Sequence, residues 1–272
     1  MSQPKRKLQT IGLFNEKGGV GKSTIATHIA AGLALRGATV VLIDTDPQGN
    51  ATSALGHEKA PDFYDLAVRN KPWKDVLKLV LPELYEPPNE PSSGKLFLCA
   101  GNKESRNIAN SINNPAVIRR RVKELEGVVD FVIFDTSPTP SLLHAALTSA
   151  SDYVIIPTDL QEFGALQGVP ATYEHVMEIH TEAMARGLSI AKPLAILPNK
   201  YQKNITVQKE ILENLKNNSA YGNIVWEEIP LLTAFSEAQV TSRLLYAYAP
   251  KSKAVAYMWQ LIDHLMEEVY AS

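Results

Sequence analysis

Short runs of apolar residues alternate along the chain with longer stretches in which apolar residues recur every three or four positions. The short runs are bounded by turn-forming residues and are typical of buried strands, whereas the longer stretches are typical of helices. Strands are expected at residues 10–14, 39–43, 95–99, 128–134, 153–157, 193–197 and 224–226. Helices are expected at residues 22–36, 113–126, 142–149, 165–186, 206–217 and 251–269. This alternation predicts an α/β fold in which helices cover both faces of a mostly parallel central sheet.

The length and composition predict a single folded unit. The chain has 272 residues, of which 45% are hydrophobic, and no internal repeat divides it. We therefore expect one domain over residues 1–272, built around one sizeable core. Residues 82–94, "PELYEPPNEPSSG", contain four prolines. They predict a surface loop, which is either a plain connection or a partner-binding segment.

Charge, cysteine content and hydropathy exclude several classes of protein. Lysine and arginine number 27 against 29 aspartate and glutamate residues, so a formal net charge of −2 gives the whole molecule no strong attraction to polyanions. A lone cysteine, Cys99, excludes an internal disulfide and a metal site of several thiolates, and it is expected to be buried and inert. No apolar run reaches 18 residues, so we expect neither a membrane span nor a signal peptide, and a cytoplasmic location.

The segment "KGGVGKST", residues 17–24, lies between the first expected strand and the first expected helix. In that setting, backbone N–H groups and a helix N-terminus can surround a phosphate chain. Gly18, Gly19 and Gly21 allow the backbone to come close, because a side chain there would collide with phosphate or forbid the required dihedral angles. The segment therefore predicts a phosphate-binding P-loop.

Polar side chains of this loop predict phosphoryl chemistry. Lys22 is expected to reach the β and γ phosphates, and Ser23 to offer its hydroxyl to Mg²⁺. The loop departs from the common motif G-x-x-x-x-G-K-[ST] in one respect, because Glu16 replaces the first glycine and a second lysine, Lys17, follows it. The common motif contains one lysine and therefore gives Lys17 no role.

Two of the expected strands end in carboxylates. "VVLIDTDPQGN" carries Asp44 and Asp46, and "VVDFVIFDTSP" carries Asp135. All three are expected at the carboxyl edge of the sheet, where ligands bind in open α/β folds. Asp135 ends a hydrophobic strand as in a Walker B motif, so it is assigned to Mg²⁺, held through a water. For one of Asp44 and Asp46, capping of the turn before Pro-Gln-Gly is the alternative to a chemical role.

These segments resemble a known family. "KGGVGKST", "DTDPQGNATSALG" and "FVIFDTSP" are similar to motifs of the deviant Walker A ATPases, specifically the ParA/Soj branch that positions plasmids, chromosomes and other large cargo in bacteria. Residues 156–169 and 229–258 resemble later segments of that branch, so the similarity runs nearly end to end. The resemblance implies a P-loop NTPase with three αβα layers that hydrolyses ATP to ADP and phosphate with Mg²⁺.

The resemblance also implies roles for individual residues. Lys17 matches a lysine that reaches across a two-fold interface to the partner's ATP, so that two protomers close face to face; contact with its own nucleotide is the alternative. Catalysis is thus assigned to Lys17, Lys22 and Asp46, with Asp46 orienting the attacking water. Metal binding is assigned to Ser23, Asp44 and Asp135. Nucleotide contacts are assigned to Lys17, Gly18, Gly19, Val20, Gly21, Lys22, Ser23, Thr24, Asn199 and Pro230, the last two to adenine.

Similarity to the ParA/Soj branch further implies a homodimer that binds non-specific DNA, associates with the nucleoid when ATP-bound and is stimulated by a ParB-like or adaptor protein on the cargo. Relatives carry arginines in an IPRNVR stretch, but this chain has "IPLLTA", with Leu231 and Ala234 at those positions. Residues 192–253 hold eight basic and five acidic residues, a net charge of +3. DNA binding is assigned to Arg243, Lys251 and Lys253, with a merely solvated basic face as the alternative.

Other function classes fit the sequence less well than the ParA/Soj hypothesis. A MinD-like ATPase would end in a basic amphipathic helix, whereas "AYMWQLIDHLMEEVYAS" has no Lys or Arg, so no membrane partner is expected. A nitrogenase-type iron protein would need several cluster cysteines. A sequence-specific repressor would need a helix-turn-helix module before the P-loop, which about ten residues precede. The remaining alternative is a metabolic P-loop ligase that uses ATP on a small acid, like the dethiobiotin synthetase type.

Overall fold

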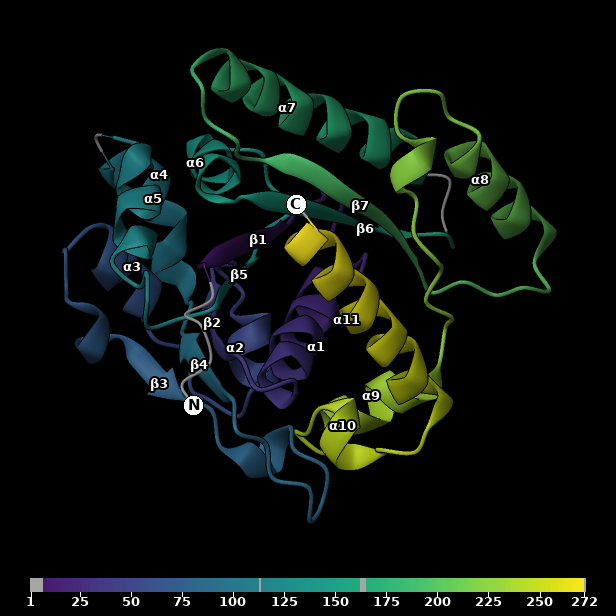
Figure 1. Cartoon of the computed structure of the whole chain (residues 1–272), viewed down its shortest axis with the longest axis horizontal. Coiled ribbons are helices and arrows are strands. Elements are labelled where there is room, and N and C mark those ends of the chain that lie inside the picture. Colours follow the sequence, from purple (N-terminus) through teal and green to yellow (C-terminus); the bar gives the residue numbers. More distant parts are fainter. Residues whose placement is uncertain (1–6, 113, 162–164, 272) are drawn as a thin grey trace.

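The computed structural model describes residues 7–112, 114–161 and 165–271. A seven-stranded sheet forms its centre, in the order β3-β4-β2-β5-β1-β6-β7, with helices on both faces (Figure 1). Neighbouring strands are parallel except for β3, which runs antiparallel to β4. This confirms the expected three-layer α/β architecture. The strands are β1 (Gln9–Leu13), β2 (Thr39–Asp44), β3 (Leu77–Leu79), β4 (Lys95–Cys99), β5 (Phe131–Asp135), β6 (Tyr153–Asp159) and β7 (Lys192–Asn199).

The six helices expected from the sequence are present, with ends that differ by up to three residues. They are α1 (Lys22–Leu35), α5 (Ala116–Lys123), α6 (Leu142–Ala150), α7 (Ala165–Ala185), α8 (Thr206–Lys216) and α11 (Lys253–Ala271). Residue 113, the expected start of α5, lies outside the described residues. None of the described helices combines the length and apolarity needed to cross a membrane.

Short helical segments are present that the sequence pattern did not predict. Each spans at most eight residues, too few for a helical period to be recognised. They are α2 (Asn50–Ala54), α3 (Asp62–Ala67), α4 (Ile108–Ser111), α9 (Thr233–Val240), α10 (Leu245–Tyr248), and the 3₁₀ helices η1 (Trp73–Asp75), η2 (Pro82–Leu84), η3 (Lys103–Asn107) and η4 (Gly222–Ile224).

The prediction of a strand at residues 224–226 is wrong. This segment begins with the last residue of η4 and makes one isolated bridge to β7, between Val225 and Ile196. Trp226 is buried and its N–H donates to the Ile196 carbonyl at 3.0 Å, so burial against the edge of the sheet, and not strand pairing, explains the apolar sequence. Conversely, β3 was missed because it has only three residues, none of them fully buried.

Alternate strand residues build two cores, one on each face of the sheet. Val40 and Leu42 pack with α1 and α11, whereas Val41 and Ile43 pack with α3, α5 and α6 on the opposite face. Cys99 lies fully buried in the second core, and burial raises the pKa of its thiol well above the ordinary value. It is the inert core residue that the sequence predicted.

The helix that follows the P-loop is packed closely against the C-terminal helix. At Gly32 of α1, an added Cβ would lie 2.7 Å from Ile262 Cγ1 and 2.7 Å from the hydroxyl oxygen of Tyr246. A glycine is therefore required for the approach of α11, which runs beside α1 in Figure 1. This contact fixes the position of α1, whose N-terminus forms part of the site described below.

Residues 82–94 are irregular apart from η2, as expected for a loop. Two contacts nevertheless attach them to the body of the protein. Tyr85 is 1% exposed within the first core, and the Ser92 hydroxyl donates to the carbonyl of Ala34 at 2.7 Å. The loop is thereby fastened near the C-terminal end of α1.

Candidate active site

The loop between β1 and α1 has the backbone of a phosphate cradle. Gly19 and Gly21 have positive φ angles of 77° and 97°, which favour glycine. Gly21 precedes the first residue of α1, whose first-turn N–H groups have no acceptor within the helix. Gly18, Gly19 and Gly21 line a cavity of about 810 Å³. Its volume is typical of a small-molecule site.

This cavity lies at the carboxyl edge of the sheet, between the P-loop and α9. Besides the P-loop, its walls come from the segment after β2, from η3, from the segment between β5 and α6, and from α9 and the residues that follow it. The lining residues that the sequence did not single out include Gln48, Asn50, Ser105, Arg106, Ser137, Thr139, Ser141, Phe235 and Gln239. Gln48, Asn50 and Ser137 lie within the motifs that follow β2 and β5, whereas the others are outside any motif quoted above.

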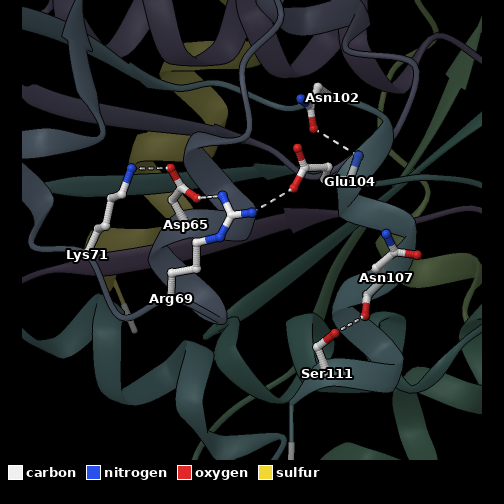
Figure 2. Close-up of polar contacts among 7 residues, drawn as sticks. All are labelled: Asp65, Arg69, Lys71, Asn102, Glu104, Asn107 and Ser111. Atoms are coloured by element: carbon white, nitrogen blue, oxygen red, sulfur yellow. Dashed lines mark hydrogen bonds and ion pairs between the residues drawn. The ribbon is translucent and has the colours of Figure 1, made fainter.

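The wall formed by η3 is held by a network of charged side chains. Figure 2 shows that Asp65 of α3 accepts from both Arg69 and Lys71, and that Arg69 also reaches Glu104 of η3 at 3.3 Å. The Asn102 side chain caps η3 by accepting from the Glu104 N–H at 2.9 Å. Burial alone would raise the pKa of Asp65, but the two cations outweigh burial and lower it. The network fixes the segment that brings Ser105 and Arg106 to the cavity.

Lys22 is buried at the floor of the cavity, where a phosphate chain would lie. Its Nζ donates to the carbonyl oxygens of Asn15 at 2.8 Å and Lys17 at 2.9 Å. Burial lowers the pKa of Lys22 to about 8, against the opposing charges of Asp135 and Asp46. An anionic ligand beside this ammonium would offset its loss of hydration.

Asp135 ends β5 and is fully buried. Neither of its carboxylate oxygens has a hydrogen-bond partner among the described residues. Burial raises the pKa of Asp135 well above the ordinary value, the charges of Asp44 and Asp46 add to that rise, and Ser23 and Lys22 oppose it. A buried carboxylate without partners is costly unless a cation or a proton is supplied.

Asp44 and Asp46 have different surroundings. Asp44 is enclosed by α2, because its Oδ2 accepts from the Thr52 N–H at 2.8 Å and from the Thr52 hydroxyl at 2.7 Å. Burial raises the pKa of Asp44 to about 6, although Thr52 opposes the rise. Asp46 lines the cavity, and its Oδ1 accepts from the Gln48 N–H at 2.8 Å. Asp46 therefore faces the cavity, whereas Asp44 lies behind it and accepts from the Asp46 N–H at 3.2 Å.

Four of the other predicted nucleotide contacts lie in three places. Ser23 and Thr24 line the cavity. Asn199 lies at the end of β7 beside the loop, and its Nδ2 donates to the Val20 carbonyl at 2.9 Å. Pro230 forms an isolated parallel bridge with Tyr201, which is two residues after Asn199. Neither Asn199 nor Pro230 lines the cavity.

Comparison with known proteins identifies the family. A family model described as an AAA domain matches residues 8–190. The chain is also 30% identical over 250 residues to the sporulation initiation inhibitor protein Soj of Bacillus subtilis, with 89% of this chain and 92% of that protein covered. The chain belongs to the ParA/MinD-type P-loop ATPases. The family expected from the sequence motifs is thus confirmed.

Other relatives agree with this assignment. The chromosome-partitioning ATPase Soj of Thermus thermophilus is 28% identical over 264 residues, 97% of each chain. A McdA variant from Cyanothece solved in complex with ATP has a TM-score of 0.78 at 20% identity, with 97% of each chain covered. Cobyrinic acid a,c-diamide synthase from Mycobacterium smegmatis, solved with ADP and magnesium, has a TM-score of 0.75 at 22% identity, covering 97% of this chain and 96% of the synthase. At such identities the structural likeness shows the fold alone.

The donor set of this ParA/MinD-type ATPase fits a magnesium ion. Magnesium prefers oxygen ligands, retains several waters and uses one or two carboxylates together with substrate phosphates. The partnerless carboxylate of Asp135 and the cavity-lining hydroxyl of Ser23 supply such oxygens. Across the described ranges, no group of three or more His, Cys, Asp and Glu side chains forms a metal site by itself. A bound phosphate would therefore have to complete the coordination.

His28 ties the P-loop helix of the ATPase to α10. Its Nδ1 lies 2.7 Å from the Thr24 carbonyl and its Nε2 accepts from the Leu245 N–H at 3.2 Å, so the neutral ring donates at one nitrogen and accepts at the other. The Tyr246 hydroxyl also donates to the His28 carbonyl at 3.1 Å. Burial lowers the pKa of His28 to about 4.

The neutral state of His28 predicts a pH dependence of stability. The folded protein keeps His28 neutral down to about pH 4, whereas the unfolded chain protonates it from about pH 6.5, so its contribution is complete above pH 6.5 and falls as the pH is lowered. Between pH 7 and pH 5 this amounts to about 2 kcal/mol of unfolding free energy. Urea unfolding of His28→Asn should lack that loss. His264→Asn, at an exposed histidine, should retain it, and an equal loss in all three proteins would contradict the assignment.

Proposed function

We propose that this protein is a partition or positioning ATPase that binds ATP with Mg²⁺, closes into a homodimer over two nucleotides and hydrolyses ATP when a cargo-linked partner stimulates it. The proposal is supported by the family and by relatives whose names include chromosome-partitioning ATPase Soj and cell division protein PomZ. A ParB-like or adaptor protein is the proposed activator, and the cargo is a plasmid, a chromosome or an organelle.

Hydrolysis is assigned to the residues gathered around the cavity. Lys22 would offset charge on the β and γ phosphates, and Asp46, which faces the cavity, would orient the attacking water. Ser23 and Asp135 would hold Mg²⁺, which neutralises the developing phosphate charge when bound. Asp44, held by Thr52, would support this group by accepting from the Asp46 N–H and so positioning the Asp46 turn. Asn199 and Pro230 remain the proposed contacts to adenine.

The position of Lys17 carries the proposal of a dimer. Lys22 lines the cavity of its own chain, but Lys17 does not. The Lys17 N–H donates to the Asn15 side chain at 2.8 Å, and its Cβ lies near Gly168 of α7. A lysine held beside the P-loop, yet outside its own cavity, is suited to supply charge to the nucleotide of a second protomer, in the manner of an arginine finger.

Non-specific DNA binding is assigned to the dimer. Lys251 and Lys253 are exposed at the N-terminal end of α11, where a positive helix end disfavours lysine and favours phosphate. Neither lysine has an ion-pair partner among the described residues. Arg243 is exposed at the cavity. The positive charge available for DNA is lower than the count over residues 192–253 implied, because Lys200 pairs with Asp159 and Lys216 pairs with Glu228. Nucleoid association would follow from two such patches on one dimer.

A metabolic ligase is the less favoured function. The diamide synthase shares the fold at 22% identity, whereas the chromosome-partitioning ATPase Soj of Thermus thermophilus is 28% identical over 264 residues. Function is carried by sites and not by folds, so the shared fold gives no support for ligase activity. Release of ADP and phosphate without an added acid would agree with the positioning ATPase.

Lys17→Ala and Lys22→Ala should separate assembly from nucleotide binding. Lys22→Ala should lose ATP binding, because the main charge on the phosphates is removed. Lys17→Ala should bind ATP within a few-fold of the parent but remain monomeric. Calorimetry and light scattering with ATP measure the two properties. Normal ATP-dependent dimerisation of Lys17→Ala would contradict the proposed action across the interface.

DNA binding should depend on the nucleotide. In Asp46→Ala, which should hydrolyse ATP slowly, ATP should tighten binding to arbitrary duplex DNA by about tenfold or more over ADP at low salt, since a dimer doubles the number of neutralised phosphates. Replacing Arg243, Lys251 and Lys253 by Glu should abolish this gain while light scattering still reports a dimer.

A matched charge reversal controls for net charge in that experiment. Lys74, Lys123 and Arg186 are exposed and lie outside the cavity, so their replacement by Glu should leave most of the DNA affinity. Equal retention with ATP and ADP would exclude DNA as the matrix. Equal losses in the two triple variants would exclude the proposed patch.

A further inference from the structure

Side chains from the end of β7 hold the carbonyl oxygens of the P-loop. Lys200 Nζ donates to the Gly19 carbonyl at 2.7 Å, and Asn199 Nδ2 donates to the Val20 carbonyl at 2.9 Å. Gly19 lines the cavity, but Lys200 does not. The Gly19 carbonyl therefore points toward a side chain that lies outside the cavity lining.

Lys200 is itself held in place from two sides. Its Nζ also lies 2.7 Å from Asp159 Oδ2, at the end of β6, and its N–H donates to Asn199 Oδ1 at 2.9 Å. Asp159 is largely buried, and its second carboxylate oxygen accepts from the Gln161 N–H at 2.8 Å. The ammonium is thus fixed between one carboxylate and one carbonyl oxygen.

The backbone at Lys200 is strained. Its φ is 56°, in the left-handed region that a lysine rarely occupies and that glycine or asparagine would adopt more easily. Strain of this kind persists only where surrounding contacts impose it, and it is concentrated at functional sites. Here the strained residue is the one that reaches the P-loop.

The chemistry of phosphate binding explains why the Gly19 carbonyl needs a partner. A phosphate cradle requires N–H groups that point inward, and a carbonyl oxygen turned into the cavity would repel the phosphates. Glycine gives this peptide unit exceptional rotational freedom. An ammonium outside the cavity would favour the outward orientation.

We propose that Lys200 is a positioning residue of the ATPase site, which keeps the P-loop ready for phosphate by holding the Gly19 carbonyl outside the cavity, with Asp159 orienting the ammonium. Lys200 acts through the loop and does not touch the nucleotide. Loss of Lys200 should therefore weaken the binding of ligands whose phosphates enter the loop. It should leave the contacts to the rest of the nucleotide unchanged.

Nucleotide binding and hydrogen exchange of Lys200→Met test this proposal. The affinity for ADP should fall about tenfold, whereas the weak affinity for AMP, which lacks the β phosphate, should change less than twofold. In the nucleotide-free protein, the amides of residues 18–21 should exchange faster than in the parent. Lys203→Met, at an exposed lysine three residues on, removes the same charge and should change neither property.

Two further variants separate positioning from folding. Lys200→Gly removes the same contacts as Lys200→Met but relieves the backbone strain, so it should melt above Lys200→Met and still lose ADP affinity. Asp159→Asn should produce a smaller loss in the same direction, and the double variant should be no worse than Lys200→Met alone. Parent-like ADP affinity in Lys200→Gly, equal losses for ADP and AMP, or unchanged amide exchange in Lys200→Met would overturn the proposal.

Discussion

The burial of like charges at the carboxyl edge of the sheet governs the structure of the site. Asp44 and Asp135 face each other in register on β2 and β5, both with no exposed surface, and Asp46 follows closely. Lys22 is the buried cation among them, and its ammonium is engaged by carbonyl oxygens of the loop. Such a group is costly to bury without compensation. A phosphate beside Lys22 and a cation beside Asp135 would supply this compensation, so the burial of these charged groups favours a charged ligand.

Much of the fold and the centre of the site could be predicted from sequence because both are encoded locally. Buried parallel strands appear as apolar runs, and long helices show their period over several turns. The P-loop is one contiguous segment whose glycines and Lys22 act within eight residues of one another. Short elements such as β3 and α9 have too few residues for a period, and the apolar run around Trp226 reflects burial without strand pairing.

Residues that act through tertiary contacts could not be predicted in this way. His28 gains its role from Leu245, Lys200 from Gly19, and Arg243 reaches the cavity because α9 folds over α1. Counting charges along the sequence likewise included Lys200 in a DNA-binding patch, although the fold commits it to Asp159. The P-loop motif therefore predicts the centre of the site, whereas the side chains around it come from distant segments that only the fold brings together.

The account rests on Asp135 being a buried carboxyl group that a cation relieves, and proton exchange on binding tests it most directly. Metal ligands must be deprotonated, so Mg²⁺ should displace a proton from a carboxyl group whose pKa burial has raised. Titrations of ADP at several pH values from 5 to 7, with and without Mg²⁺ and in buffers of different ionisation enthalpy, give the protons exchanged. The parent should release more protons with Mg²⁺ than Asp135→Asn does. Equal proton release by the two proteins would contradict the account.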